Sequence, residues 1–370
     1  MYIDFNEPSE LASAITVPAD DPATYLLMIS DAHQHQIEDI IDSLNQRGIT
    51  FYGAVFPGLL HGRQQKHSGA IIKQHRGGSK PVVISLKDLD ASSLIDELPQ
   101  VPSGTAGKPS LHVFVDCLAP SVSGFLNTLF NHYANRLTYF GGGAGNSRLE
   151  KAPCVFSNNG VFDDAAVLSI DERPSTLNVK HGWQRVEGPF IATRTEGSII
   201  KEFNWEPALD VYRRSLPEAL RDTPADQFFS KITPVYPFSI EKDGSEDIVR
   251  DPVGFTEEGG IVCISDVTEN SVMYLVHGEQ DKLIAAASDA VAEIVSEADT
   301  DAEECLVCDC FSRALLFGDE FERELDRVAD QLDRTGGELL AEGALVLGEV
   351  ASDGEQSLEF YNKTFVVSLS

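Results

Sequence analysis

The sequence predicts an α+β or α/β protein of two domains, in which mixed β-sheets are flanked by helices and strand–helix–strand units are duplicated. Three segments carry this pattern, each with an apolar strand, an amphipathic helix and a second apolar strand marked by glycine. Each segment then continues into another apolar run with hairpin-like spacing, which favours mixed over purely parallel sheets. The irregular spacing of the segments indicates duplication with insertions and excludes a solenoid.

The elements of the three copies follow in chain order. Paired strands are expected at 25–29 and 51–56 in the first copy, 111–117 and 137–140 in the second, and 305–310 and 344–350 in the third. Apolar side chains between the strands of each pair recur at helical spacing: Ile37, Ile40, Ile41 and Leu44, then Phe125, Leu129 and Tyr133, then Phe321, Leu325, Val328 and Leu332. The pattern therefore predicts that the three copies are related strand–helix–strand units.

A domain boundary is expected where prolines interrupt the chain between residues 216 and 240. We place the two domains at 20–225 and 226–370. The start of the chain has no basic segment followed by an apolar one, and no run of 18 apolar residues occurs, so neither a signal peptide nor a membrane span is expected. Six scattered cysteines suit a reducing compartment, which predicts a cytoplasmic protein.

Charge is distributed unevenly along the chain. The net charge is −31, and residues 241–360 hold 32 acidic but only 7 basic side chains. Such a surface repels phosphate backbones, so we expect no nucleic-acid partner; it is either a solvated surface or a docking face for a basic protein. Residues 61–80 are the opposite, with five basic residues, three histidines and no acid. That stretch is a solvated hairpin, or it contacts an anionic ligand or the acidic half of the same chain.

Two motifs invite a catalytic or cofactor interpretation that their surroundings do not support. The glycine run 141–145 lacks the sixth-position glycine and the following helix of a dinucleotide loop, and it lacks the Gly-Lys-Ser/Thr end of a P-loop. It is better explained by close backbone packing or by amides that wrap a ligand. Cys305, Cys308 and Cys310 lack a second ligand pair for zinc and are expected in the core. With no recognised catalytic signature, the sequence predicts a binding protein and not an enzyme.

An ordered set of short motifs resembles the FIST family of sensory proteins. In the C-terminal half these are 235–238, 250–254, 308–318, 347–350, 352–354 and 360–365; in the N-terminal half they are 139–145, 181–183 and 207–212. The resemblance implies a ligand-sensing protein of bacterial signal transduction. Its stand-alone form resembles the branch of nitric-oxide-sensing haemoproteins, which implies haem as a cofactor, one of nine histidines as its axial ligand, and a histidine kinase as partner.

The resemblance also places candidate ligand-binding residues, and here several alternatives stay open. Arg313 could pair with a ligand carboxylate or a haem propionate, Glu349 with a ligand amine or with Arg313, and Asn362 can donate and accept hydrogen bonds. Arg250, Gly142 and Gly143 complete the set. The structural alternative is an ion pair that ties the C-terminal sheet together. The functional alternatives are a sensor of a small molecule such as an amino acid, without haem, or a ligand-free interaction or scaffold module.

Overall fold

The computed structural model describes residues 1–16, 23–75, 79–87, 89, 91–102, 107–297, 302–336 and 339–370. These residues form two compact units. Unit 1 contains residues 1–179, 287–360 and 365–370, and unit 2 contains residues 180–286 and 361–364. Each unit is assembled from separate parts of the chain. The limits of the two compact units therefore differ from the boundary expected at residue 225. Within the described residues, no helix is long and apolar enough to cross a bilayer.

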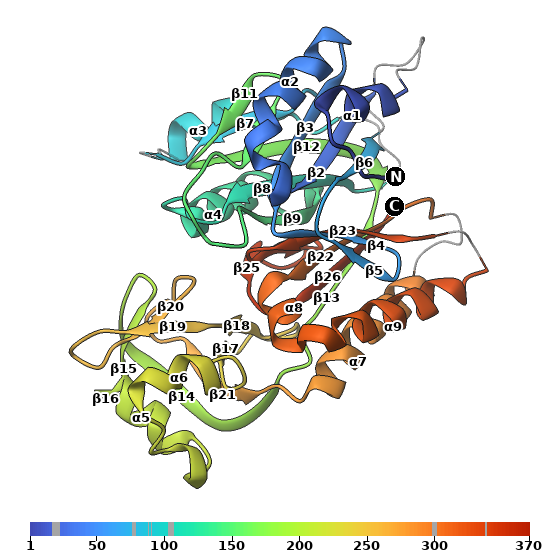
Figure 1. Cartoon of the computed structure of the whole chain (residues 1–370). Helices are drawn as coiled ribbons and strands as arrows, with labels where there is room; N and C mark the ends of the chain where they lie inside the picture. The colour runs from blue at the N-terminus through green and yellow to red at the C-terminus, as the bar shows by residue number, and fades with distance from the viewer. Residues whose placement is uncertain are drawn as a thin grey trace. The chain divides into compact units, whose positions relative to one another are not determined.

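Unit 1 is built from three six-stranded sheets, and each contains one of the predicted copies (Figure 1). In the first copy, β2 (Thr24–Ser30) and β3 (Thr50–Phe56) are parallel and β6 (Ala70–His75) runs antiparallel to β2. β1 (Tyr2–Ile3) pairs with β6, and β11 (Gly160–Phe162) closes the other edge beyond β10 (Val155–Ser157). The connecting α2 (Ile37–Gln46) buries the four predicted apolar side chains.

The second and third copies repeat this arrangement. In the second, β8 (Pro109–Asp116) and β9 (Thr138–Ala144) are parallel, β12 (Ala165–Pro174) is antiparallel to β8, and β7 (Val82–Ser85) is at the edge. In the third, β22 (Cys305–Cys310) and β23 (Ala341–Val346) are parallel and β26 (Phe365–Leu369) is antiparallel to β22. The helices between the parallel strands are α4 (Val122–Tyr133) in the second copy and α8 (Phe311–Phe317) and α9 (Phe321–Asp333) in the third.

The three sheets exchange strands in a closed cycle. The chain leaves β3 into β4 (Gly58–His61), which pairs with β23 of the third copy. It leaves β9 towards β10, which pairs with β3 of the first copy, and it leaves β23 into β24 (Glu349–Ser352), which pairs with β9 of the second. Each copy thus completes another copy's sheet, so the connectivity of unit 1 has approximate threefold symmetry and no copy is complete alone.

Equivalent glycines show how closely the copies correspond. Gly53 lies opposite Leu27, Gly141 opposite Val113, and Gly343 opposite Val307. A Cβ atom at any of the three would come within 2.0 Å of the carbonyl oxygen of that opposite residue. The glycine that marks the second strand of each copy therefore permits a backbone approach that no larger residue allows. The predicted role of Gly141 in close backbone packing is confirmed.

Apolar side chains on the strands pack against the helices. Leu111, Val113 and Val115 of β8 form one core cluster with Phe125 and Leu129 of α4. Cys305, Cys308 and Cys310 are buried in β22, as predicted. The expected single strand 344–350 is wrong: Gly348, with φ +103°, turns the chain between β23 and β24, and a Cβ there would strike the Phe360 ring.

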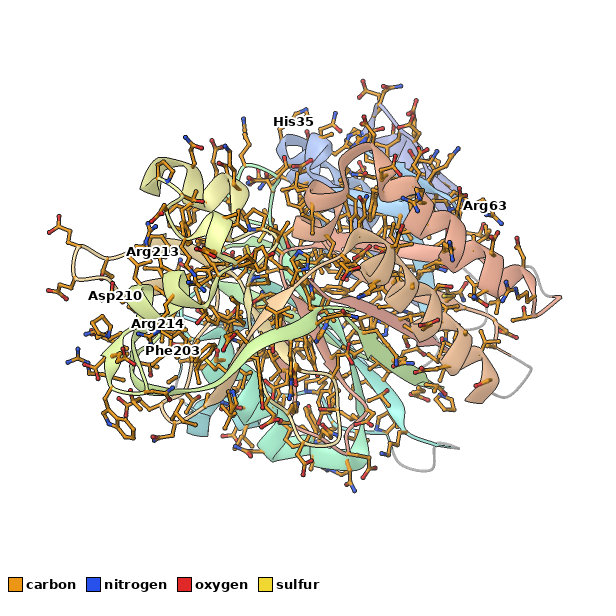
Figure 2. All side chains as sticks on the ribbon, turned by 90° about the horizontal axis from the view of Figure 1, so that it is seen from below. His35, Arg63, Phe203, Asp210, Arg213 and Arg214 are labelled. Carbon is orange, nitrogen blue, oxygen red and sulfur yellow. The ribbon has the colours of Figure 1, made fainter. Side chains whose placement is uncertain are left out.

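Unit 2 contains one antiparallel sheet with small helices. Its strands follow the order β18 (Ile248–Arg250), β17 (Phe238–Ile240), β21 (Val272–His277), β14 (Gln184–Glu196), β15 (Ile199–Phe203), β20 (Ile261–Cys263) and β19 (Pro252–Phe255). Tyr212 of α5 (Ala208–Ser215) and Phe228 of α6 (Ala225–Lys231) join its apolar cluster. The charged side chains of α5, including Asp210, Arg213 and Arg214, are drawn in Figure 2. Mixed sheets with helices in both units confirm the predicted α+β class.

Candidate functional site

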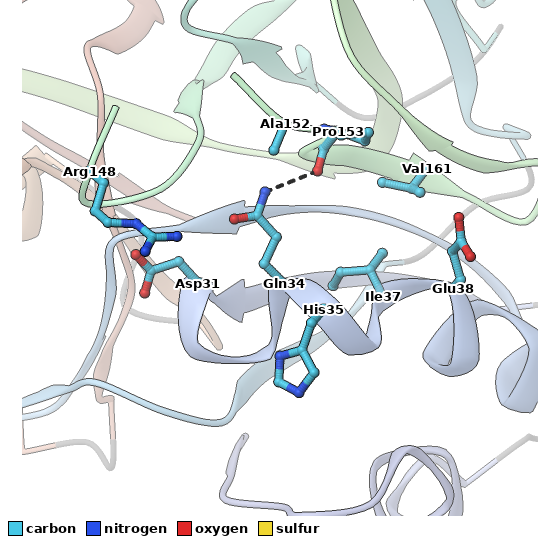
Figure 3. Close-up of a pocket in the computed structure, with 9 residues that line it drawn as sticks. All are labelled: Asp31, Gln34, His35, Ile37, Glu38, Arg148, Ala152, Pro153 and Val161. Atoms are coloured by element: carbon cyan, nitrogen blue, oxygen red, sulfur yellow. Dashed lines mark hydrogen bonds between the residues drawn. The ribbon is translucent and has the colours of Figure 1, made fainter. Parts of the chain in front are cut away.

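A polar pocket of about 450 Å³ lies in unit 1 where β2 ends (Figure 3). One wall is the short helix η1 (Asp31–Gln36) with the start of α2, and the other is the loop that leads from β9 to β10. Polar and charged groups are prominent among the lining residues, which are Asp31, Gln34, His35, Ile37, Glu38, Arg148, Ala152, Pro153 and Val161. The pocket therefore combines residues of the first copy with a loop of the second.

Hydrogen bonds fix the loop against the helix. The buried Asn146 side chain accepts from the backbone N–H groups of Arg148 and Glu150 and donates to the carbonyl oxygen of Glu150. The Gln34 side chain donates to the Pro153 carbonyl oxygen at 3.3 Å, and the Ser147 amide donates to Asp31 Oδ2 at 2.8 Å. The two walls are thus held together by direct polar contacts.

The pocket carries both signs of charge. Figure 3 shows Arg148 beside Asp31 at one end of the pocket and Glu38 at the other. Arg148 is 74 % exposed and its guanidinium lies 3.1 Å from the Glu150 carboxylate, also an exposed group, so a ligand can compete for it in water. An arginine near two carboxylates can receive a ligand with a carboxylate and an amine.

A second polar region, which we call the inner network, lies in unit 1 at the starting ends of β2, β8 and β22. It consists of Lys73, Asp171, Arg173, Glu304 and Glu342, all mostly buried. Lys73 Nζ lies 3.1 Å from Glu304 and 2.7 Å from Glu342, and Arg173 Nη2 lies 2.5 Å from Asp171 and 2.6 Å from Glu304. The Met1 amine and His61 Nδ1 also contact Glu342, at 3.0 and 2.9 Å.

These cations outweigh the cost of burying the carboxylates. Burial alone would raise the pKa of Glu342, but the charge of Lys73 and its hydrogen bond lower the pKa to about 2. Burial likewise opposes ionisation of Glu304 and Asp171, yet their pKa values are lowered, chiefly by Lys73 for Glu304 and by His75 and Arg173 for Asp171. The network is therefore ionic at neutral pH.

Two histidines beside the inner network share one tyrosine. The hydroxyl of Tyr52 lies 2.8 Å from His75 Nδ1 and 2.9 Å from His112 Nδ1. Burial lowers the pKa of both imidazoles, so both are neutral at pH 7. Because the hydroxyl has one proton to donate, it donates to one ring and accepts from the other.

The structure places the predicted Arg313 in the interior. Its side chain is fully buried, with Nε 3.2 Å from Asp309 Oδ1 and Nη2 paired with Glu324 of α9. We call Asp309, Arg313 and Glu324 the buried trio. Burial raises the pKa of Asp309 and raises that of Glu324 well above its usual range, with Arg313 opposing the shift in each case. This environment matches the structural alternative, an ion pair that ties the third copy together.

The other predicted residues of unit 1, which are Glu349, Gly142 and Gly143, lie in paired β-strands. Glu349 begins β24, opposite Gly142 of β9, and its side chain is fully buried. The amide of Gly143 donates to the Gly348 carbonyl oxygen at 2.7 Å. A Cβ at Gly142 would come within 2.8 Å of the Val346 side chain. Gly142 and Gly143 therefore serve tight strand packing in this structure.

The structure places the two predicted residues of unit 2 in internal polar contacts. Arg250 donates to the carbonyl oxygens of Asp266 and Val249, and Asn362 accepts from the hydroxyl of Ser265 at 3.2 Å. The residues that follow them are paired, with Lys363 Nζ 3.0 Å from Asp251 Oδ2. The positive charge of Lys363, next to the predicted Asn362, thus has a buried internal partner.

The basic stretch 61–80 contacts the acidic part of the same chain. Arg63 forms ion pairs with three aspartates on successive turns of α9: Asp326 at 3.2 Å, Asp330 at 2.8 Å and Asp333 at 2.7 Å. Lys73 pairs with Glu304 and Glu342, as described above. Of the three alternatives for this stretch, the structure supports the intramolecular one. Arg76 lies outside the described residues.

The histidines buried in unit 1 do not suit an axial haem ligand. His75 lies 3.9 Å from Asp171 of the inner network, His112 packs edge-on against His75, and the His33 ring stacks on Phe5. His35 is exposed and lines the polar pocket described above, whereas sites for a large apolar cofactor are lined mainly by hydrophobic side chains. The surroundings of these four histidines therefore do not suit an axial haem ligand.

Sequence reasoning missed the pocket residues Asp31, Gln34 and Glu38. The available signal was their position: polar side chains follow directly after the apolar strand of the first copy, where ligands of α/β sheets commonly bind. That Arg148 would join them could not be seen, because its loop belongs to the second copy.

Comparison with protein-family models identifies two matches that lie next to each other in the chain. Residues 23–206 match the FIST N domain and residues 208–352 match the FIST C domain. A search of curated proteins finds no match to the chain. The matches span most of the sequence, with the N domain first, as the motifs predicted. The motif 207–212, which we assigned to the N-terminal half, lies almost wholly in the FIST C match, and the motif 360–365 lies beyond it.

Proposed function

Since the chain belongs to the FIST family and carries sensory domains of signal transduction, we propose that it senses a small zwitterionic molecule such as an amino acid in the pocket between η1 and the 146–153 loop. The observation that carries this proposal is the placement of Arg148 beside Asp31, with Glu38 in the same pocket. Arg148 binds the ligand carboxylate, and Asp31 and Glu38 bind its amine.

The pocket also suits a signalling role because it joins two copies. The ligand contacts η1 and α2 of the first copy and the loop before β10, which is a strand of the first sheet supplied by the second copy. A ligand that binds one arrangement of these two walls better than another shifts the populations of the two arrangements. A partner protein responds to this shift in population. Our candidate for this partner is a histidine kinase.

The experiment is a thermal-shift screen of the twenty amino acids, followed by calorimetry on any hit. A ligand at 100 times its Kd stabilises the folded state by about 2.7 kcal/mol, a readily measured shift. Asp31→Asn and Arg148→Met should each weaken binding at least tenfold. Arg214→Met is the matched control, because Arg214 is an exposed arginine paired with Glu206 at 2.7 Å. Equal binding by R148M and wild type, or no hit at all, contradicts the proposal; the latter result favours the ligand-free interaction module.

The haem and nitric-oxide version is a separate proposal that rests on the resemblance alone. Protein reconstituted with haemin would show a Soret band that shifts on binding and again on adding nitric oxide. Absence of either shift contradicts this version and leaves the amino-acid version untouched.

A further inference from the structure

Independently of the ligand pocket, one residue from each copy of unit 1 contributes a metal-ligating side chain to a single point. His75 is on β6 of the first copy, Asp171 on β12 of the second, and Glu304 directly precedes β22 of the third. His75 and Asp171 hold equivalent positions, because His75 lies opposite Thr24 and Asp171 opposite Ser110 near the starts of β2 and β8. One ligand atom of each of the three residues lies within 4.8 Å of the others.

His75 supplies the observation that points to a ligand. Its side chain is 1 % exposed, its Nε2 has no hydrogen-bond partner, and this atom lies 3.9 Å from Asp171 Oδ2. When Nδ1 donates its hydrogen to Tyr52 and Tyr52 donates to His112, Nε2 carries a lone pair directed at the carboxylates. Metal-bound histidines are commonly held in this way through their second nitrogen.

Arg173 competes for the same place. Its Nη2 atom lies between Asp171 Oδ2 and Glu304 Oε2, at 2.5 and 2.6 Å. The side chain is 14 % exposed, so it lies at the rim of the cluster. Exchange of this guanidinium for a divalent ion adds only one positive charge, and Lys73 continues to neutralise part of Glu304 and Glu342.

We propose that His75, Asp171 and Glu304 bind a first-row divalent cation such as Zn²⁺ or Co²⁺, and that Arg173 competes with this ion for the two carboxylates. One imidazole and two carboxylates favour these ions over Ca²⁺ or Mg²⁺, which prefer oxygen ligands throughout. Tetrahedral ligands at about 2.1 Å from an ion lie about 3.4 Å apart, so the 3.9 Å separation of His75 and Asp171 needs little adjustment. The bound ion ties the three copies together.

The test is a Co²⁺ titration followed by visible absorption, with wild type, Arg173→Gln, His75→Gln and the double variant, all first checked for folding by circular dichroism. We expect Arg173→Gln to bind one Co²⁺ per chain at least tenfold more tightly than wild type, and His75→Gln to abolish binding in both backgrounds. His67→Gln removes an exposed histidine and serves as the control, with no change expected.

Three results overturn the proposal. Arg173→Gln binds Co²⁺ no more tightly than wild type, His75→Gln retains full binding, or the spectrum shows thiolate charge transfer, which assigns the ion to cysteines. If Arg173→Gln does not fold, the thermal shift produced by Zn²⁺ in wild type against His75→Gln decides: a shift lost in His75→Gln supports the site, and equal or absent shifts refute it.

Discussion

Unit 1 buries charge in two places, and the two differ in the balance between cations and carboxylates. In the inner network Lys73 and Arg173, together with the neighbouring Met1 amine, form ion pairs with three carboxylates. These groups remain partly accessible to solvent. The buried trio sets Arg313 alone against Asp309 and Glu324, and these three side chains are 0 % exposed. Carboxylate pKa values are lowered in the first and raised in the second.

The comparison teaches that burial does not by itself decide the sign of a pKa shift. Burial opposes ionisation at both places, and enough nearby cations reverse the outcome in the inner network. In the trio a single guanidinium faces two carboxyl groups and does not offset the cost of burying them, so the pKa of each is raised. The inner network is thus a set of ion pairs, whereas the trio has one cation for two carboxyl groups, an arrangement that favours the protonated form of one of them.

The largest expected effect is the loss of the single cation of the trio. Arg313→Met leaves Asp309 and Glu324 buried without a positive partner, and we expect the free energy of unfolding to fall by about 3–5 kcal/mol. Urea denaturation at pH 7 measures the change. Arg323→Met is the control, because the exposed Arg323–Glu320 pair should contribute at most about 0.5 kcal/mol. A loss below about 1 kcal/mol for R313M would show that the trio is not a charged cluster.

The next effect is a loss of stability in acid that comes from the inner network. The folded pKa of Glu342 is about 2 and its ordinary value is 4.5, so its contribution is present above pH 4.5 and is lost as the pH falls towards 2. The shift corresponds to about 3 kcal/mol. Unfolding free energies measured from pH 6 to pH 2.5 should fall steeply in wild type and less steeply in Glu342→Gln. Parallel curves would contradict the ionic description of the network.

The sequence predicted the repeated elements well because each strand and helix needs its own apolar face. It did not predict which sheet β4, β10 and β24 would join, since these strands have three or four residues and pair with segments far away in the chain. Such pairings are determined by tertiary packing and leave little local pattern.

The site was predicted less well, and Arg313 shows why. Family resemblance marked it as a ligand contact, but its surroundings depend on Glu324, which lies among the buried residues of α9. A charged residue on the apolar face of an amphipathic helix, next to Leu325 and one turn before Val328, was the signal that a buried partner exists. The pocket around Asp31 and Arg148 joins two copies, and one copy read alone cannot show it.

The smallest expected effect concerns the carboxyl group of Glu324 in the trio. If Glu324 is protonated in the folded state, Glu324→Gln replaces one neutral hydrogen-bonding group by another, and the free energy of unfolding measured near pH 4, where the unfolded carboxyl group is also protonated, should change by no more than about 1 kcal/mol. Because the folded pKa of Glu324 is raised, its contribution is complete below pH 4.5 and is lost as the pH rises through the folded value. The glutamine variant lacks this loss, so its stability relative to wild type should increase between pH 5 and pH 8. A variant as unstable as Arg313→Met at pH 7 would mean that Glu324 is ionised and that both clusters are sets of full ion pairs.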